Sequence, residues 1–294
     1  MHVAQLWQHP VKSMIGVDVE TAELTAAGMV GDRWWAVRDE VRGGIRGAKK
    51  IGDLMRLASQ YVGDAHGAVE ITLPDGTTVR SDDADVDAKL SAALDHAVTL
   101  WPLQPADHLD HYRRGAPDSD DVMDELRSIF GREVDEPLPD FSIFPPVVME
   151  FESPPGIYLD AFPLLVMTTS ALRSLAAALP DSAIDVRRFR PNIVIDTGDE
   201  PGHPEFGWRG TTLQIGETTL DVIDPCPRCV MVTREVSPDV PADRAVLRYV
   251  VRELDQNVGV YATVSVGGRV SVGDEVSLTL AAGVPPSPPL DAPA

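Results

Sequence analysis

The chain carries both of its cysteines in one stretch, Asp224-Pro225-Cys226-Pro227-Arg228-Cys229-Val230-Met231-Val232. The guanidinium of Arg228 stands between the two thiols, and a neighbouring cation favours the thiolate form that binds soft metals. The apolar residues 230–232 predict that the stretch enters a β-strand. Two cysteines this close together cannot staple distant elements, so the sequence indicates a reducing compartment and points to thiolate chemistry.

Other kinds of site also use a Cys-x-x-Cys pair, and the sequence weighs against two of them. A structural zinc site would need a second pair of ligands, and none of the seven histidines has His-x₃₋₅-His spacing. A thioredoxin-type redox pair opens a helix after a strand, whereas a strand-like run follows this pair. A purely structural pair that binds nothing stays open as an alternative for Cys226 and Cys229.

Glycine-containing turns lie on both sides of the cysteine stretch. Gly216-Glu217 and Gly267-Gly268 each separate two short apolar runs, which predicts two β-hairpins. The paired runs are residues 213–215 with 218–223, and residues 261–266 with 269–272. Residues 242–254, between the two hairpins, have the apolar spacing of an amphipathic helix. The cysteines are therefore expected in a β-rich part of the chain.

The rest of the chain divides into a strand-rich beginning, an acidic junction and a proline-rich end. In the beginning, strand-like runs occupy residues 2–8, 17–24, 33–38, 69–73, 78–80 and 98–101, with a helix at 85–94. After the junction, residues 162–167 form a short apolar run, a helix is expected from about residue 169 to about residue 180, and residues 193–196 are a predicted strand. The predicted organisation is a first unit at residues 1–101, a junction with one helix at 102–146, a second unit at 147–282 and a disordered tail at 283–294.

The composition excludes several classes of partner. Lys and Arg total 25 against 46 Asp and Glu, which gives a formal net charge of −21. Nucleic acids and anionic membranes would be repelled at long range, so any phosphate must bind in a local cationic pocket. The first residues show no signal-peptide pattern, and no apolar run approaches the roughly 18 residues of a spanning helix. We therefore predict a cytoplasmic protein with no membrane and no nucleic-acid partner.

Cationic side chains beside predicted strands are the candidates for such a pocket. They are Lys12, Arg33 and Arg190. Ser13 follows Lys12 directly, and the amide of Asn192 lies two residues after Arg190. Each alone is more often solvated or salt-bridged, but the fork of an arginine pairs bidentately with phosphate oxygens. Residues 43–50, Gly-Gly-Ile-Arg-Gly-Ala-Lys-Lys, lack the Gly-Lys-Ser/Thr ending of a P-loop, so we interpret them as a basic turn.

Taken in order, these motifs resemble the MOSC superfamily, named for the C-terminal domain of molybdenum cofactor sulfurases, in the two-part form that includes the mitochondrial amidoxime reducing component. Besides the cysteine stretch, the motifs are His9-Pro10-Val11-Lys12-Ser13, Gly31-Asp32-Arg33-Trp34-Trp35, Asp160-Ala161-Phe162-Pro163, Arg188-Phe189-Arg190-Pro191-Asn192, Gly259-Val260-Tyr261 and Val272-Gly273-Asp274. Together they cover nearly the whole chain. The fold that this implies is α+β and β-rich, with an N-terminal β-barrel-like unit packed on a C-terminal MOSC β-barrel with peripheral helices.

The resemblance also implies a role for each candidate residue. Cys229 would be the catalytic residue and the ligand of molybdenum, with Arg228 contacting the molybdenum cofactor and Cys226 only a neighbour. The other cofactor contacts would come from Lys12, Ser13, Arg33 and Arg190 at the phosphate and pyranopterin, and from Asn192 and Asp160 at the ring system.

Members of this family reduce N-hydroxylated compounds, such as amidoximes, hydroxylamines and N-hydroxylated bases, in a two-electron metal cycle. No cysteines are left for an iron–sulfur domain, so the expected partners are a separate electron-donor reductase or electron carrier and a small-molecule substrate. Two alternatives stay open. One is a carrier of sulfur or of the molybdenum cofactor with no redox turnover, and the other is an interaction module in which the cysteine pair is structural.

Overall fold

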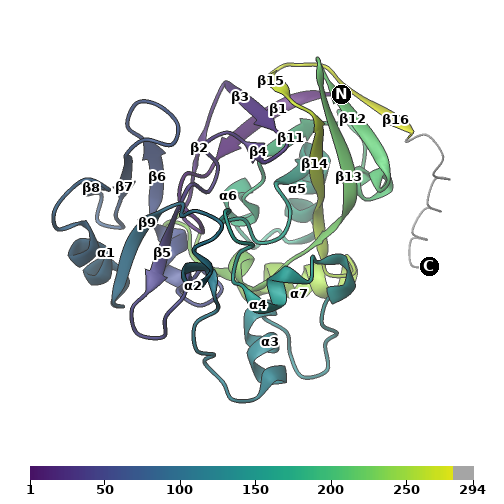
Figure 1. Cartoon of the computed structure of the whole chain (residues 1–294). Helices are drawn as coiled ribbons and strands as arrows, with labels where there is room; N and C mark the ends of the chain where they lie inside the picture. Colours follow the sequence, from purple (N-terminus) through teal and green to yellow (C-terminus); the bar gives the residue numbers. More distant parts are fainter. Residues whose placement is uncertain (281–294) are drawn as a thin grey trace.

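The computed structural model describes residues 1–280 (Figure 1), so the tail predicted at 283–294 lies outside the described residues. The strands are β1 (His2–Gln8), β2 (Val17–Asp18), β3 (Thr21–Thr25), β4 (Gly28–Met29), β5 (Trp35–Asp39), β6 (Ala58–Tyr61), β7 (Val69–Thr72), β8 (Thr78–Arg80), β9 (Val98–Pro102), β10 (Leu164–Thr168), β11 (Ile193–Asp196), β12 (Thr211–Ile215), β13 (Thr218–Pro227), β14 (Asn257–Val266), β15 (Gly268–Ser271) and β16 (Val276–Leu280). The α-helices are α1 (Val86–Leu94), α2 (Leu109–Tyr112), α3 (Val122–Phe130), α4 (Val147–Glu150), α5 (Thr169–Ala178), α6 (Val186–Phe189) and α7 (Arg244–Glu253). Four 3₁₀ helices are η1 (Gly52–Arg56), η2 (Phe141–Ile143), η3 (Pro204–Trp208) and η4 (Val230–Thr233).

An eight-stranded sheet forms the larger part of the fold, in the order β16-β12-β13-β14-β10-β11-β1-β2. Its neighbouring strands are antiparallel except for β10 and β11, which are parallel because α5 crosses over between them. An apolar core packs against it and includes Leu6, Val166, Ile195, Leu220 and Val260. Strand β1 belongs to the predicted first unit and β11 to the predicted second unit, yet the two strands pair. The unit boundary predicted at residue 101 therefore separates parts of one sheet in the sequence.

Three smaller sheets complete the β structure: β15-β3-β4, β5-β9 and β6-β7-β8. A second apolar core lies among the last two of them, η1 and α1, and includes Val11, Leu54, Ile71, Leu90 and Val98. In Figure 1 the strands β6, β7 and β8, with α1, lie on the side of the molecule opposite β12 and β16. The protein is therefore a β-rich α+β protein, as the sequence predicted.

A third apolar core joins α5, α6, α7 and η4. It includes Met167, Phe189, Val232, Leu247 and Val258. Apolar residues of α7 recur at helical spacing on its buried face, and Asp243 caps the helix by accepting a hydrogen bond from the backbone N–H of Ala245 at 2.8 Å. This core fixes η4, which begins immediately after Cys229. Within residues 1–280, no helix is both long and apolar enough to cross a membrane.

The strand predicted at residues 230–232 is wrong. Strand β13 ends at Pro227, and Val230–Thr233 form the 3₁₀ helix η4 with Val232 fully buried. A short apolar run fits a buried strand and a buried helical turn equally well, so periodicity alone could not separate them. Because no strand follows the cysteines, this argument against a thioredoxin-type redox pair no longer applies. The roles of the two thiols must be judged from their surroundings.

The hairpin predicted at Gly267-Gly268 is also wrong. β15 pairs with β3 instead of β14, in the register Gly268 opposite Leu24. A tight two-residue hairpin of this kind needs positive φ angles, and neither glycine has one. A Cβ on Gly267 would lie 2.7 Å from the carbonyl oxygen of Leu24, so this glycine instead allows the two segments to approach closely.

Candidate functional site

Cys226 and Cys229 are both free thiols, but they have different surroundings. Cys226 is 4% exposed, and Arg228 donates a hydrogen bond from Nη1 to its Sγ at 3.2 Å. Burial raises the pKa of Cys226, against the opposing effect of Arg228. Cys229 is partly exposed and occupies the position before η4. Cys229 is therefore the thiol that a ligand can reach, and Cys226 is a buried partner of Arg228.

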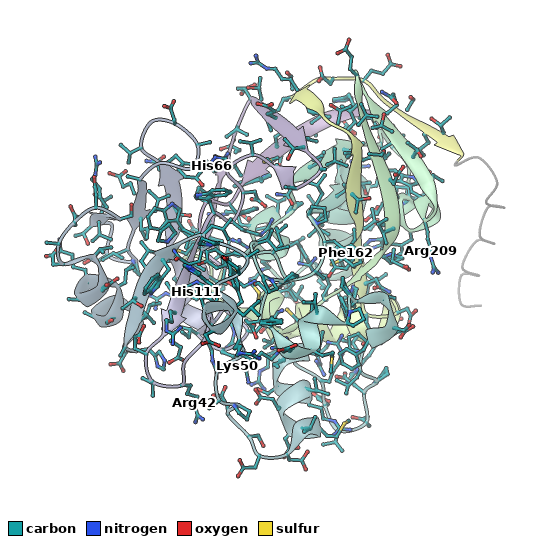
Figure 2. All side chains as sticks on the ribbon, viewed as in Figure 1. Arg42, Lys50, His66, His111, Phe162 and Arg209 are labelled. Carbon is teal, nitrogen blue, oxygen red and sulfur yellow. The ribbon has the colours of Figure 1, made fainter. Side chains whose placement is uncertain are left out.

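An aromatic pair lies beside this loop, because Tyr261 of β14 is opposite Asp224 of β13. Phe162 and Tyr261 stack with their ring centroids 4.6 Å apart, and Phe162 is labelled in Figure 2. Burial, followed by the neighbouring Cys226, raises the pKa of Tyr261. Both rings belong to motifs that carry the family resemblance, but nothing in their spacing placed them beside the cysteines.

Four cationic side chains lie within electrostatic reach of Cys229, and a thiolate there favours the charged form of each. They are Lys49, Arg132, Arg228 and Arg234. Only Arg228 was a candidate from the sequence. The other three come from distant parts of the chain, so only the fold reveals that they surround one thiol. In a chain of net charge −21, this concentration of positive charge marks a site for an anion.

Arg132 fixes the backbone of the cysteine loop. It is 6% exposed, and it donates from Nη2 to the carbonyl oxygen of Arg228 at 3.0 Å and to Oε1 of Gln256 at 2.9 Å. The backbone N–H of Arg228 in turn donates to the carbonyl oxygen of Gln256 at 2.8 Å. Burial lowers the pKa of Arg132 to about 10. The acidic junction thus supplies a residue that positions Cys229.

Lys12 and Asp160, both predicted site residues, form an ion pair together with Lys49. The Lys12 ammonium donates to Oδ1 of Asp160 and to the carbonyl oxygen of Tyr158, the latter at 2.9 Å. The Lys49 ammonium lies 2.9 Å from Oδ2 of Asp160. Burial raises the pKa of Asp160, but the two ammonium groups outweigh it and hold that pKa well below its usual range. One carboxylate therefore faces two cations, and a net positive charge remains.

The segment interpreted as a basic turn is held against Lys12 and Ser13. The hydroxyl of Ser13 accepts a hydrogen bond from the backbone N–H of Ala48 at 3.0 Å. A Cβ on Gly47 would lie 2.6 Å from that hydroxyl oxygen, so only glycine fits there without a shift. This contact brings Lys49 into the site. The only sequence signal for this contact is the run of glycines and lysines at 43–50, which lacks the ending of a P-loop and by itself indicates no more than a basic turn.

Three of the predicted site residues have the left-handed backbone conformation that non-glycine residues rarely adopt. They are Ser13 with φ 69°, Arg33 with φ 51° and Arg190 with φ 56°. Such conformations cost of order 1–3 kcal/mol each and concentrate at functional sites. Their agreement with the candidates chosen from sequence is an independent reason to regard this region as the site.

Arg190 is a buried cation without a partner. It is 5% exposed, and neither Nη1 nor Nη2 has a hydrogen-bond acceptor among the described residues. Burial, and then the charge of Arg33, lower its pKa to about 9. Burial, with Arg190 and Arg33 adding to it, also lowers the pKa of His9 well below its usual value. A buried guanidinium fork with two free donor groups calls for an oxyanion.

Asn192 uses its side chain mainly to join strands. Its Oδ1 accepts hydrogen bonds from the backbone N–H of Leu165 at 3.2 Å and from Arg33 at 3.4 Å. Arg33 also pairs with Asp32. Asn192 thereby holds Arg33 in place, and its predicted contact with a cofactor ring stays a prediction.

The residues present fit a phosphate-bearing metal cofactor. Lys12, Lys49 and Arg190 supply cationic donors, and Cys229 supplies a thiol that a soft metal can take as a ligand. No group of three or more His, Cys, Asp or Glu side chains within residues 1–280 could hold a metal ion. A metal at Cys229 would therefore need ligands from a cofactor in addition to those that the described residues supply.

Comparison with known families agrees with this site. Residues 1–110 match the family model of the MOSC N-terminal beta barrel domain, and residues 156–277 match that of the MOSC domain. The chain belongs to the MOSC family. The family resemblance seen in the sequence is thus confirmed, and the MOSC domain match includes Asp160, Arg190, Cys226 and Cys229.

Relatives of known name cover much of this MOSC protein. It is 27% identical over 246 residues to mitochondrial amidoxime reducing component 2 of Bos taurus, which covers 81% of the chain and 67% of the relative. It is 26% identical over 259 residues to mitochondrial amidoxime-reducing component 1 of Homo sapiens, covering 81% and 66%. The chain thus spans about two thirds of the length of these relatives. A molybdenum cofactor sulfurase of Drosophila grimshawi is 42% identical over 81 residues, which is 26% of this chain and 10% of the sulfurase.

Among solved structures, the YUAD protein from Bacillus subtilis aligns over 94% of both chains with 11% identity and a TM-score of 0.42. This similarity is too weak to support any functional assignment.

Proposed function

We propose that this MOSC protein is a molybdenum-cofactor-dependent oxidoreductase that reduces N-hydroxylated compounds with electrons from a separate reductase or electron carrier. The observation that carries the proposal is an accessible thiol, Cys229, together with a buried cation, Arg190, whose Nη1 and Nη2 have no acceptor within residues 1–280. Relatives named amidoxime reducing components, which align over 81% of the chain, support the reaction class. Action in the cytoplasm stays a prediction.

The cofactor would be held by the cations of the site. Cys229 would ligate molybdenum, and Arg228 would contact the cofactor from the same loop. The phosphate and pyranopterin would be bound by Lys12, Ser13, Arg33 and Arg190, and the ring system by Asn192 and Asp160. Lys49 would be a further contact, a role supported by its ion pair with Asp160. When bound, the cofactor supplies the two-electron redox chemistry.

The chain's own residues would bind the substrate and manage its protons. Reduction of an amidoxime to an amidine consumes two electrons and two protons and releases the hydroxyl oxygen as water. Lys49 pairs with Asp160, lies within electrostatic reach of Cys229 and has a side chain that is 22% exposed, so we assign it a hydrogen bond to a ligand beside Cys229. The ion pair with Asp160 keeps that ammonium charged, since burial alone would lower its pKa and the pair raises it.

A second function is a carrier of sulfur or of the cofactor itself, without redox turnover. The local match to a molybdenum cofactor sulfurase favours it. The two functions differ in what Cys229 carries in the purified protein. A persulfide on Cys229 in protein that contains no metal would indicate the carrier.

The test is reduction of benzamidoxime by protein from a molybdate-supplied host, with chemically reduced methyl viologen as electron donor. We expect turnover by the wild type, none by Cys229→Ala, and retained turnover by Cys226→Ala, because Cys226 is buried against Arg228. Undiminished turnover by Cys229→Ala would contradict the proposal. A molybdenum-loaded wild type that reduces no N-hydroxylated compound would shift it to the carrier function.

A further inference from the structure

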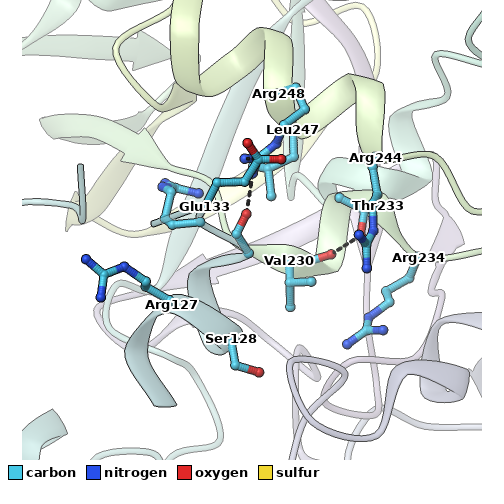
Figure 3. Close-up of a pocket in the computed structure, with 11 residues that line it drawn as sticks. Arg127, Ser128, Glu133, Val230, Thr233, Arg234, Arg244, Leu247 and Arg248 are labelled. Carbon is cyan, nitrogen blue, oxygen red and sulfur yellow. Dashed lines mark hydrogen bonds and ion pairs between the residues drawn. The ribbon is translucent and has the colours of Figure 1, made fainter. Parts of the chain in front are cut away.

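A cavity of about 440 Å³ lies between α3, η4 and α7 (Figure 3). Five arginines line it, against a single carboxylate, that of Glu133. The arginines are Arg127, Arg132, Arg234, Arg244 and Arg248. The chain has 46 acidic and 25 basic residues, so a cavity with this excess of guanidinium groups is the reverse of its overall composition.

Two of these arginines are already satisfied by the protein. Arg248 is paired with Glu136 and lies 3.6 Å from Glu133. The guanidinium of Arg132 donates its hydrogen bonds to Oε1 of Gln256 and to backbone carbonyl oxygens. Their charges are therefore neutralised or committed to structure, and they are not the ligand-binding members of the set.

The other three arginines have no carboxylate within 4.0 Å in the part of the chain that the structure describes. Arg127 donates only to the carbonyl oxygen of Val134, at 3.3 Å, and its buried Nε has no partner there. Arg234 donates only to the carbonyl oxygen of Lys49, at 3.3 Å, and its buried Nε is likewise without one. Burial lowers the pKa of Arg234, and the charge of Arg244 adds to this. Arg234 and Arg244 thus repel each other, and the charge of the nearby Asp53 opposes this effect on Arg234.

Other arginines of the chain contrast with these three. Arg80 pairs with Asp82, Arg187 with Asp185 and Arg209 with Asp224, at distances of 2.8 to 3.2 Å. Acidic side chains are abundant, yet within residues 1–280 none lies within 4.0 Å of the guanidinium groups of the three cavity arginines. An unneutralised guanidinium cluster in a cavity of this size suits the anionic group of a small molecule.

We propose that the cavity binds an oxyanion, a carboxylate or phosphate, carried by a small-molecule ligand. Val230, which lines the cavity, directly follows Cys229, and Arg234 reaches both the cavity and the backbone of Lys49. None of Lys12, Ser13, Arg33 and Arg190 lines it, so it is distinct from the proposed cofactor contacts. This substrate class rests on the proposed function. The substrates are N-hydroxylated compounds with an acidic substituent, which binds in this cavity while the N–O group faces Cys229.

The direct test is calorimetric titration of the purified protein with inorganic phosphate. We expect Arg127→Gln and Arg244→Gln each to weaken phosphate binding about tenfold or more, the loss expected for one charge-assisted hydrogen bond. Arg269 is an exposed residue of β15 outside the cavity, so Arg269→Gln is the matched control and should bind phosphate like the wild type. Unchanged binding in both cavity variants would overturn the proposal, as would binding that is lost only in Lys12→Gln. Loss of molybdenum from Arg244→Gln would also overturn it, because the cavity would then belong to the cofactor site.

A steady-state kinetic comparison of two substrates tests the substrate class. The ratio of kcat/KM for 4-carboxybenzamidoxime to that for benzamidoxime should fall about tenfold in Arg127→Gln and in Arg244→Gln. It should not change in Arg269→Gln. An unchanged ratio in the cavity variants would refute the substrate assignment. If the wild type reduces neither compound, the proposed function fails, and the phosphate titration still decides whether the cavity binds oxyanions.

Discussion

Replacement of Arg190 by glutamine should stabilise the cofactor-free protein while it removes a contact that the cofactor needs. Arg190 is 5% exposed, its Nη1 and Nη2 have no acceptor within residues 1–280, and its pKa is lowered from 12.5 to about 9 by burial and by Arg33. At about 1.36 kcal/mol per pKa unit, holding this charge in the folded state costs roughly 5 kcal/mol. A guanidinium keeps its proton in proteins, so the cost appears as lost stability.

The glutamine amide that replaces it would still be buried, at a cost of about 1–3 kcal/mol. The net gain is then about 2–4 kcal/mol, or a rise in Tm of roughly 3–6 °C for a chain of 294 residues. We would measure urea and thermal unfolding of protein made in a host that lacks the cofactor. Molybdenum content would be measured in protein from a host that makes it, where the variant should retain little.

Arg188 provides the matched control two residues away. It is 1% exposed, but its guanidinium donates to the carbonyl oxygens of Ala183, Arg234 and Pro241 at 2.6 to 3.0 Å. Arg188→Gln should therefore destabilise the protein by about 3 kcal/mol or more, since three buried acceptors lose a charged donor. Arg190→Gln that destabilises the cofactor-free protein as strongly as Arg188→Gln would refute the reasoning.

Three further predictions concern pH, a close contact and thiol reactivity. Burial, then Arg190 and Arg33, keep the pKa of His9 well below 6.5, so below that pH the unfolded chain takes up a proton that the folded protein does not; stability should fall by up to about 1.4 kcal/mol per pH unit on acidification, and urea unfolding at pH 5 and 7 should show a shallower fall in His9→Gln. Gly47→Ala places a methyl group 2.6 Å from the Ser13 hydroxyl oxygen, so it should cost about 1–3 kcal/mol in denaturant unfolding and reduce molybdenum content; an unaffected variant would show that the turn is not tightly held. Iodoacetamide should label Cys229 and spare Cys226 in the native cofactor-free protein, as read by peptide mass spectrometry, and equal labelling would contradict the surroundings assigned to the two thiols.

Much of the local structure follows from the sequence because it depends on near neighbours. The predicted strands at 2–8 and 193–196 coincide with β1 and β11, and the predicted helix at 242–254 contains α7. The alternating or helical spacing of their apolar residues predicts the type of element, whichever neighbour the apolar face packs against. The errors at residues 230–232 and at Gly267-Gly268 have a different origin, since η4 is fixed by the third core and β15 by pairing with β3.

The candidate site likewise contains residues that the sequence could identify and residues that it could not. Lys12, Arg190 and Cys229 could be selected because they belong to short motifs whose order resembles a known family. Lys49 and Arg132 could not, because their importance arises from contacts across the fold: Lys49 with Asp160, and Arg132 with the backbone of the cysteine loop. Sequence spacing does not encode such contacts, and only the folded chain shows that these cations surround one thiol.

The central claim is that Cys229 holds a molybdenum cofactor together with the cations Lys12, Arg33, Lys49, Arg190 and Arg228. The most direct test is elemental analysis by inductively coupled plasma mass spectrometry on wild type, Cys229→Ala and Cys226→Ala, all purified from a molybdate-supplied, cofactor-competent host. We predict near-stoichiometric molybdenum in the wild type and in Cys226→Ala, and its loss in Cys229→Ala. Molybdenum that is absent from the wild type, or that persists in Cys229→Ala, would contradict the account.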